Sequence, residues 1–246
     1  MDTLDAEVRR VDEDRWLASR FAPAPVREAL IAIYACNHEI ARTAEVVSQP
    51  AIGDIRLAWW RDAIAEIYAG GAVRAHPVLA LLTPAIRTRD LPRAAFDALI
   101  DARHADLEAA PLTNWTAVES YVDATAGGVM RLALSVCGVR LDEAFVAQAA
   151  RVWGLLGLLR ARGAMAMHGH ALLPREATLD DALARVSDAH AAARATLPLI
   201  PAEAFPACGY VSLAPAYAKA LKQGRNRTPL LFRQFQLIAA SATGRY

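Results

Sequence analysis

The stretch that decides the fold reads Gly157-Leu158-Leu159-Arg160-Ala161-Arg162-Gly163-Ala164-Met165 and runs on to Gly169 and Leu173-Pro174. It belongs to a segment from about 142 to 167 whose apolar residues follow the spacing of one long helix. Positions 154, 157, 161, 165 and 168 fall on one face of that helix. Because this face holds glycines, an alanine and a methionine, it predicts either close helix approach or the wall of an apolar cavity.

Composition favours a cytoplasmic protein built around one large core. Apolar residues make up 55% of the 246 positions, and the net charge of +1 gives no support to nucleic-acid binding. The three cysteines, at positions 36, 137 and 208, are too far apart for a disulfide framework or a zinc cluster, so reduced thiols are expected. No signal peptide is expected from the acidic N-terminal residues, and no apolar run approaches the roughly 18 residues of a membrane span.

Apolar spacing of three and four residues along the whole chain predicts an all-α fold. Helices are expected over 30–47, from 54 to about 70 with Ile55 on the buried face, from 76, from 92 to about 109, from Asn114 to a bend at Gly127-Gly128, and over 142–167, 179–197, 213–222 and 230–240. No linker divides the chain, so residues 13–246 are expected to form one domain. Residues 1–12 and the final Gly244-Arg245-Tyr246 are expected to be disordered.

Three stretches, in order and at the right spacing, carry a family resemblance. They are Arg27 with Tyr34-Ala35; Asp106-Leu107 with Tyr121 and Ala126-Gly127; and Arg160-Ala161 with Gly169-His170 and Leu173-Pro174. Together they resemble the squalene/phytoene synthase family over about residues 14–175. The resemblance implies the isoprenoid-synthase fold, a helical bundle around a central cavity.

The family's metal-binding acids are largely missing from the two motifs that should hold them. In the first motif they would fall at Ala41, Arg42 and Glu45, and in the second at Ala161 and Met165. Magnesium requires several oxygen ligands in octahedral geometry to neutralise the diphosphate leaving group. One remaining carboxylate cannot organise such a multi-metal clamp, and Arg42 adds a repelling charge. No metal site, no cofactor and no catalytic residue are therefore predicted.

The candidate pocket consists of residues from the two motifs and of Tyr121. They are Tyr34, His38, Ala41, Arg42, Glu45, Tyr121, Gly157, Arg160, Ala161 and Met165. Arg42 forms either a surface ion pair with Glu45 or, with Arg160, a direct site for a phosphate or carboxylate. The two tyrosines are expected to pack in the core with a hydroxyl partner, with substrate contact as the alternative. A metal pair of His38 and His168 is disfavoured, because no carboxylate pattern accompanies it.

The first motif also resembles an aspartate-less branch of the family, the mitochondrial assembly factors for respiratory complex I. The resemblance lies in Asn37-His38-Glu39-Ile40-Ala41-Arg42 and in Trp59-Trp60-Arg61-Asp62. It implies a non-catalytic assembly or interaction factor with a respiratory-complex subunit or another assembly factor as its partner. The expected location is the cytoplasmic face of a bacterial inner membrane, with peripheral membrane contact.

Two rival hypotheses remain open at this point. The first is a prenyl-diphosphate transferase that uses Mg²⁺ and atypical ligands, namely Glu45 with acids such as Glu39, Asp62 or Asp106. The second is a binding protein for a prenyl lipid or a quinone, with Arg42 and Arg160 at the mouth of the cavity.

Overall fold

The computed structural model describes residues 2–108, 110–167 and 172–246, and it contains helices and no strand within these ranges. The prediction of an all-α fold is confirmed. The elements are α1 Asp2–Val11, α2 Glu13–Ser19, α3 Ala24–Ala41, α4 Thr43–Val46, α5 Pro50–Tyr68, α6 Pro77–Thr88, α7 Arg93–Ala102, η1 Arg103–Leu107, α8 Trp115–Val122, η2 Asp123–Gly127, α9 Gly128–Cys137, α10 Glu143–Met167, α11 Leu179–Thr196, α12 Phe205–Cys208, η3 Gly209–Leu213, α13 Ala214–Lys222 and α14 Leu230–Thr243.

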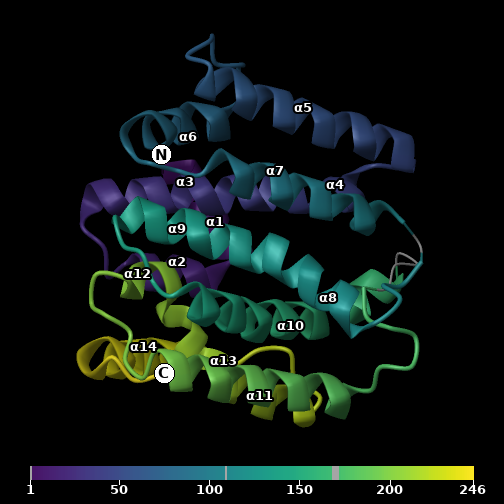
Figure 1. Ribbon diagram of the computed structural model, residues 1–246, viewed down its shortest axis with the longest axis vertical. Coiled ribbons are helices and arrows are strands. Elements are labelled where there is room, and N and C mark those ends of the chain that lie inside the picture. Colours follow the sequence, from purple (N-terminus) through teal and green to yellow (C-terminus); the bar gives the residue numbers. More distant parts are fainter. Residues whose placement is uncertain (1, 109, 168–171) are drawn as a thin grey trace.

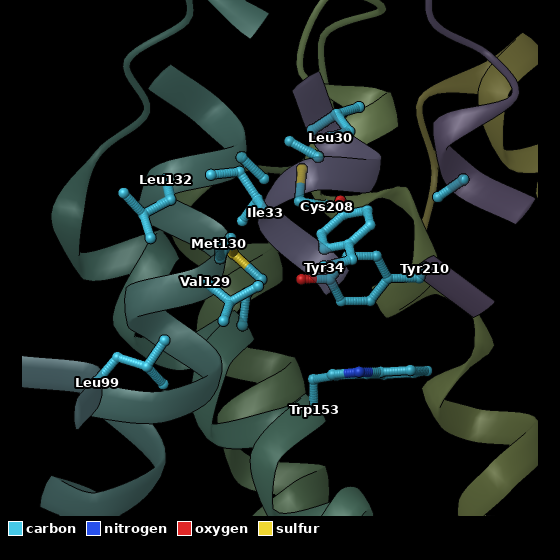
Figure 2. Packing of buried hydrophobic residues seen from close by; sticks show 14 of the residues in the cluster. Leu30, Ile33, Tyr34, Leu99, Val129, Met130, Leu132, Trp153, Cys208 and Tyr210 are labelled. Atoms are coloured by element: carbon cyan, nitrogen blue, oxygen red, sulfur yellow. The ribbon is translucent and has the colours of Figure 1, made fainter. Parts of the chain in front are cut away.

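The helices stack along the long axis of the molecule (Figure 1). Helix α5 lies at one end, helices α11, α13 and α14 lie at the other, and α3, α9 and α10 cross the middle. One cluster of buried apolar side chains connects these layers. In its interior, Tyr34, Tyr210 and Trp153 gather between α3, η3 and α10 (Figure 2), and the ring centres of Trp153 and Tyr210 are 4.9 Å apart.

Local sequence signals account for several helix ends. The Asn114 side chain caps α8 by accepting from the amide of Ala117 at 2.9 Å, as predicted. A reciprocal pair between Thr178 and Asp181 starts α11. Helix α9 stops at Gly138, whose φ of 70° lies in the left-handed region that glycine adopts without steric cost. At the predicted bend, η2 is one turn of π-helix between α8 and α9.

Both ends of the chain are ordered, which corrects the expectation of disorder. Residues 2–11 form helix α1, where Leu4 and Val8 are buried because their spacing of four places them on one face. At the other end, the Tyr246 side chain is buried and its hydroxyl donates to the carbonyl of Leu197 at 2.6 Å. A few buried apolar side chains therefore hold these two segments against the core, although most residues of the segments are polar.

Ile55 is a further correction, because its side chain is 70% exposed rather than buried. Helix α5 begins at Pro50, before the predicted start, and its inward face carries Leu57, Trp60 and Ile64. No helix in the described part of the chain is both long enough and apolar enough to cross a bilayer.

A buried carboxylate joins the N-terminal and C-terminal helices. Asp14 on α2 is 2% exposed and accepts from Arg233 on α14 and from the Tyr217 hydroxyl on α13, each at 2.6 Å. Arg233 also pairs with Glu13, and Arg160 on α10 lies 3.6 Å from Asp14. The carboxylate thus holds α2, α10, α13 and α14 together, and a charge buried at this depth depends on its partners.

We expect Asp14→Ala to lower the free energy of unfolding by about 3–5 kcal/mol, because it leaves the buried Arg233 with less compensation. The matched control is Asp90→Ala, which removes an ion pair to Arg140 whose two side chains are almost fully exposed. That change should cost less than about 1 kcal/mol. Denaturant unfolding measures both, and similar losses in the two variants would contradict the role assigned to Asp14.

Candidate functional site

A central cavity of about 640 Å³ lies between α3, α4, η1, α8, η2 and α10. The two helices that carry the family motifs face each other across it. Its lining consists of Arg15, Asn37, Ala41, Ala44, Glu45, Arg103, Asp106, Tyr121, Val122, Thr125, Ala126, Trp153, Gly154, Gly157, Leu158, Ala161, Met165 and Leu172. A bundle around a central cavity is therefore present, as the resemblance implies.

Six of the ten predicted pocket residues line this cavity. They are Ala41, Glu45, Tyr121, Gly157, Ala161 and Met165. The positions that correspond to four of the family's acids thus still face the cavity, where three of them now present apolar side chains and one a carboxylate. On α10, the helix face that carries positions 154, 157, 161 and 165 is described as far as Met165. His168 lies outside the described residues.

The other four predicted residues lie elsewhere. Tyr34 is buried in the core, as favoured, but its hydroxyl finds no partner among the described residues. His38 is half-buried on α3, outside the lining of the central cavity. Burial raises the pKa of Tyr34 well above its usual value, so its hydroxyl stays protonated.

The predicted ion pair between Arg42 and Glu45 does not form. Arg42 instead pairs with Glu39 at 3.1 Å, and Arg56 binds the other oxygen of Glu39 at 2.8 Å. The reason is that α3 ends at Ala41, so Glu45 belongs to the separate short helix α4 and does not continue the face of Arg42. Arg42 therefore does not reach the central cavity.

Arg160 lines a second space, which we call the polar cavity. This cavity of about 710 Å³ adjoins the central one and shares Arg15, Trp153, Gly157 and Ala161 with it. The guanidinium of Arg160 lies 4.3 Å from the ring centre of Tyr217 and faces Asp14. Arg42 and Arg160 are therefore not brought together on the lining of the central cavity.

Two other arginines, Arg15 and Arg103, supply the positive charge of the central cavity. Arg15 pairs with Asp12 at 2.8 Å and lies 5.1 Å from the ring centre of Tyr210. Burial opposes its charge, but Asp12 and Tyr210 hold its pKa above the ordinary value. Arg15 was not among the predicted pocket residues, because nothing in its local pattern indicates that it reaches the cavity.

Arg103 belongs to a closed polar triad with Asp106 and Tyr121. Arg103 donates to Asp106 at 3.0 Å and to the Tyr121 hydroxyl at 2.8 Å, and that hydroxyl donates to Asp106 at 2.6 Å. The structure thus joins two motif segments that lie fifteen residues apart. The spacing of three between Arg103 and Asp106 was the available signal for this contact.

Some residues of this lining have polar atoms without partners. The Nε atoms of Arg15 and Arg103 and the Oδ1 atom of Asn37 are buried and make no hydrogen bond to any described residue. Unpaired buried polar atoms are uncommon in native proteins and often mark a place where a ligand or water binds. These three atoms have almost no accessible surface, so they lie behind the wall of the central cavity and do not face its interior.

The donor set does not fit the magnesium cluster that the family implies. Of the described residues, only Glu45 and Asp106 bring carboxylates to the central cavity, and Asp106 is already bonded to a guanidinium and a phenol. Glu39 is held by Arg42 and Arg56, and Asp62 is exposed on α5 outside the cavity lining. No group of three or more histidine, cysteine or acidic residues in the described ranges is arranged to hold a metal ion.

The glycines of α10 have two different roles. A Cβ atom on Gly154 would lie 2.5 Å from the Cβ of Val122, so this glycine permits the close approach of α8. A Cβ atom on Gly157 would meet nothing within 4 Å, so this glycine opens onto the cavities. Gly154 therefore fits the prediction of close helix approach, and Gly157 fits the prediction of a cavity wall.

These arrangements define a class of protein: an all-helical bundle with the cavity of a prenyl-diphosphate enzyme and few of its acids. The squalene/phytoene synthase family model matches residues 8–232, and the chain belongs to that family.

Relatives with different functions are similar to this chain in sequence. Mouse NADH dehydrogenase (ubiquinone) complex I, assembly factor 6, is 27% identical over 81% of this chain and 67% of its own length. Presqualene diphosphate synthase of Rhodopseudomonas palustris is 31% identical over 50% of this chain and 44% of its own length. A crystal structure of a dehydrosqualene synthase in complex with ligand superposes with a TM-score of 0.79 at 16% identity, over 98% of this chain and 94% of the other, which shows the shared fold. The chain spans 40% of the length of the bovine assembly factor.

Substituting the two glycines should change stability in opposite directions. Gly154→Ala should lower the free energy of unfolding by about 1–3 kcal/mol, because the methyl group overlaps Val122. Gly157→Ala should raise it by up to about 1 kcal/mol, because alanine favours the helix and has room. Thermal or urea unfolding measures both variants, and a loss of stability in Gly157→Ala would contradict the open space assigned there.

The triad gives a pH dependence of stability. Burial raises the pKa of Tyr121 above its usual value of 10.0, so as the pH rises the unfolded chain loses this proton before the folded chain does. Tyr121 therefore contributes stability that is fully present below about pH 10 and is lost as the pH rises further. Tyr121→Phe should make the fall of unfolding free energy above pH 10 shallower by up to about 1.4 kcal/mol per pH unit. An identical slope in the wild type and the variant would refute this assignment.

Proposed function

We propose that this chain is a non-catalytic member of the squalene/phytoene synthase family that acts as an assembly or interaction factor of the respiratory complex I type. It works at the cytoplasmic face of a bacterial inner membrane, and its partner is a complex I subunit or another assembly factor. It needs no metal ion or cofactor.

One observation carries this proposal: the bundle has a central cavity, but few carboxylates of the described residues line it. Ala41 and Ala161 face each other's helices across the central cavity, where carboxylates would have to hold magnesium. The assembly factor 6 relatives supply the partner class by analogy, since they are named for complex I assembly. Without a metal ion to assist the departure of diphosphate, the scaffold acts by recognising a partner.

The test deletes the gene in its native host and measures NADH:quinone oxidoreductase activity and the complex I band on native gels. We expect both to fall, with partial complexes accumulating, and the wild-type chain to restore them. Unchanged complex I in the deletion strain would refute the proposal. Mg²⁺-dependent turnover of farnesyl or geranylgeranyl diphosphate by the purified chain would restore the prenyltransferase hypothesis instead.

A second candidate function is the binding of a prenyl lipid or a quinone. The lining of the central cavity favours it, since many of its residues are apolar and can hold a chain, and Arg15 and Arg103 belong to the same lining. The cationic residues of this site are Arg15 and Arg103, in place of Arg42 and Arg160.

Titration with a non-hydrolysable farnesyl diphosphate analogue tests this candidate. We expect saturable binding that Mg²⁺ leaves unchanged and that Gly157→Leu weakens at least about tenfold by filling the open space. Gly157→Ala is the matched control and should bind almost as well as the wild type. Binding that tightens sharply with Mg²⁺ would contradict the metal-free site, and equal binding by Gly157→Leu would place the analogue elsewhere.

A further inference from the structure

The C-terminal helix α14 presents an apolar face to solvent. Leu231, Phe232, Phe235 and Ile238 on this helix are 49–71% exposed, with Phe235 the most exposed of the four. At about 100° per residue they fall within an arc of about 120° of the helix. We call these four residues the α14 face. Large exposed apolar patches mark interaction sites, whereas scattered single residues do not.

Polar contacts fix the rotation that leaves this face outside. On the opposite side of the helix, Arg233 is buried against Asp14 and Glu13, and the Gln236 side chain donates to the carbonyl of Ser212 at 2.8 Å. Turning the apolar residues inward would break a buried ion pair, which is costly. The apolar face is therefore held outward by the fold itself.

The segment of the chain that carries the α14 face is basic. Residues 204–246 contain no aspartate or glutamate and six basic residues. These are Lys219, Lys222, Arg225, Arg227, Arg233 and Arg245. Arg233 is buried in its ion pair, and the other five are exposed. Arg225 and Arg227 lie within five residues of the start of the helix, Arg227 at the edge of the polar cavity, and Arg245 follows the helix.

We propose that the α14 face docks on an anionic phospholipid bilayer, with the helix lying in the plane of the interface. An apolar helix face flanked by basic residues is the usual form of an interfacial membrane helix. At about 21 Å for its 14 residues the helix is too short to span the roughly 30 Å hydrocarbon layer, so it lies along the surface. None of the four side chains lines a described cavity, which suits a fluid acyl layer better than the shaped groove of a protein site. The proposal deepens the proposed function, on which the inner-membrane setting rests, by naming the surface and the lipid.

Co-sedimentation with vesicles tests the α14 face directly. Vesicles of phosphatidylcholine containing about a third phosphatidylglycerol should bind the wild-type chain at least about tenfold more tightly than phosphatidylcholine alone. Phe232→Ser combined with Phe235→Ser should weaken that binding at least about tenfold, because two large apolar side chains no longer enter the interface. Arg225→Gln combined with Arg227→Gln should weaken it about fivefold for each arginine, and only on the anionic vesicles.

Ile55→Ser is the matched control, since Ile55 is equally exposed but lies on α5 at the far end of the molecule (Figure 1). It should bind like the wild type, and circular dichroism should show unchanged melting for every variant. No preference for anionic vesicles, or an equal loss in Ile55→Ser, would overturn the proposal. So would a dimer in analytical ultracentrifugation that the double serine variant dissociates, because a second copy would then cover the face. The vesicles contain no protein, so this result is independent of the complex I test.

Discussion

The buried ion pair between Asp14 and Arg233 is the constraint on which the arrangement of the molecule depends. It links two helices whose residues are 219 positions apart in the chain. Around the same carboxylate lie Tyr217 and Arg160, so one acid organises the wall of the polar cavity. Its neighbour Arg15 reaches both cavities, and the rotation of α14 follows from the position of Arg233. The same ion pair therefore positions both the wall of the polar cavity and the outward-facing side of α14.

The loss of acids changes the character of the central cavity rather than its existence. In an enzyme of this fold, metal ions between facing carboxylates would dominate the local charge. Here the charged groups on the lining are Arg15, Arg103, Asp106 and Glu45, and Asp106 is neutralised within its triad. The two guanidinium groups are themselves paired, Arg15 with Asp12 and Arg103 with Asp106. Charge-assisted hydrogen bonds from such groups can select an anionic or carbonyl group on a guest.

Local patterns predicted the elements well and the cavity only in part. The helix start marked by Asn114 could be predicted, since a side-chain cap acts over one turn. Gly157 and Ala161 were recognisable as cavity residues because small side chains follow one helix face. Arg15 and Arg103 were missed as cavity residues, because their burial depends on α2 and η1 packing against distant helices. The exposure of Ile55 and of the α14 face was not predicted, because an argument from periodicity takes every apolar residue to point inward.

The π-helical turn η2 affects where the chain can gain or lose a residue. A π turn holds one residue more than an α turn would, and such turns are frequently found at functional sites. Losing a residue inside α9 itself would rotate the core residues that follow it, such as Leu132, by about 100°. Losing the extra residue of the wider turn at 123–127 would instead leave an ordinary α turn with α9 close to its present rotation. This segment of the cavity wall can therefore change its length by one residue while the core behind it stays in place.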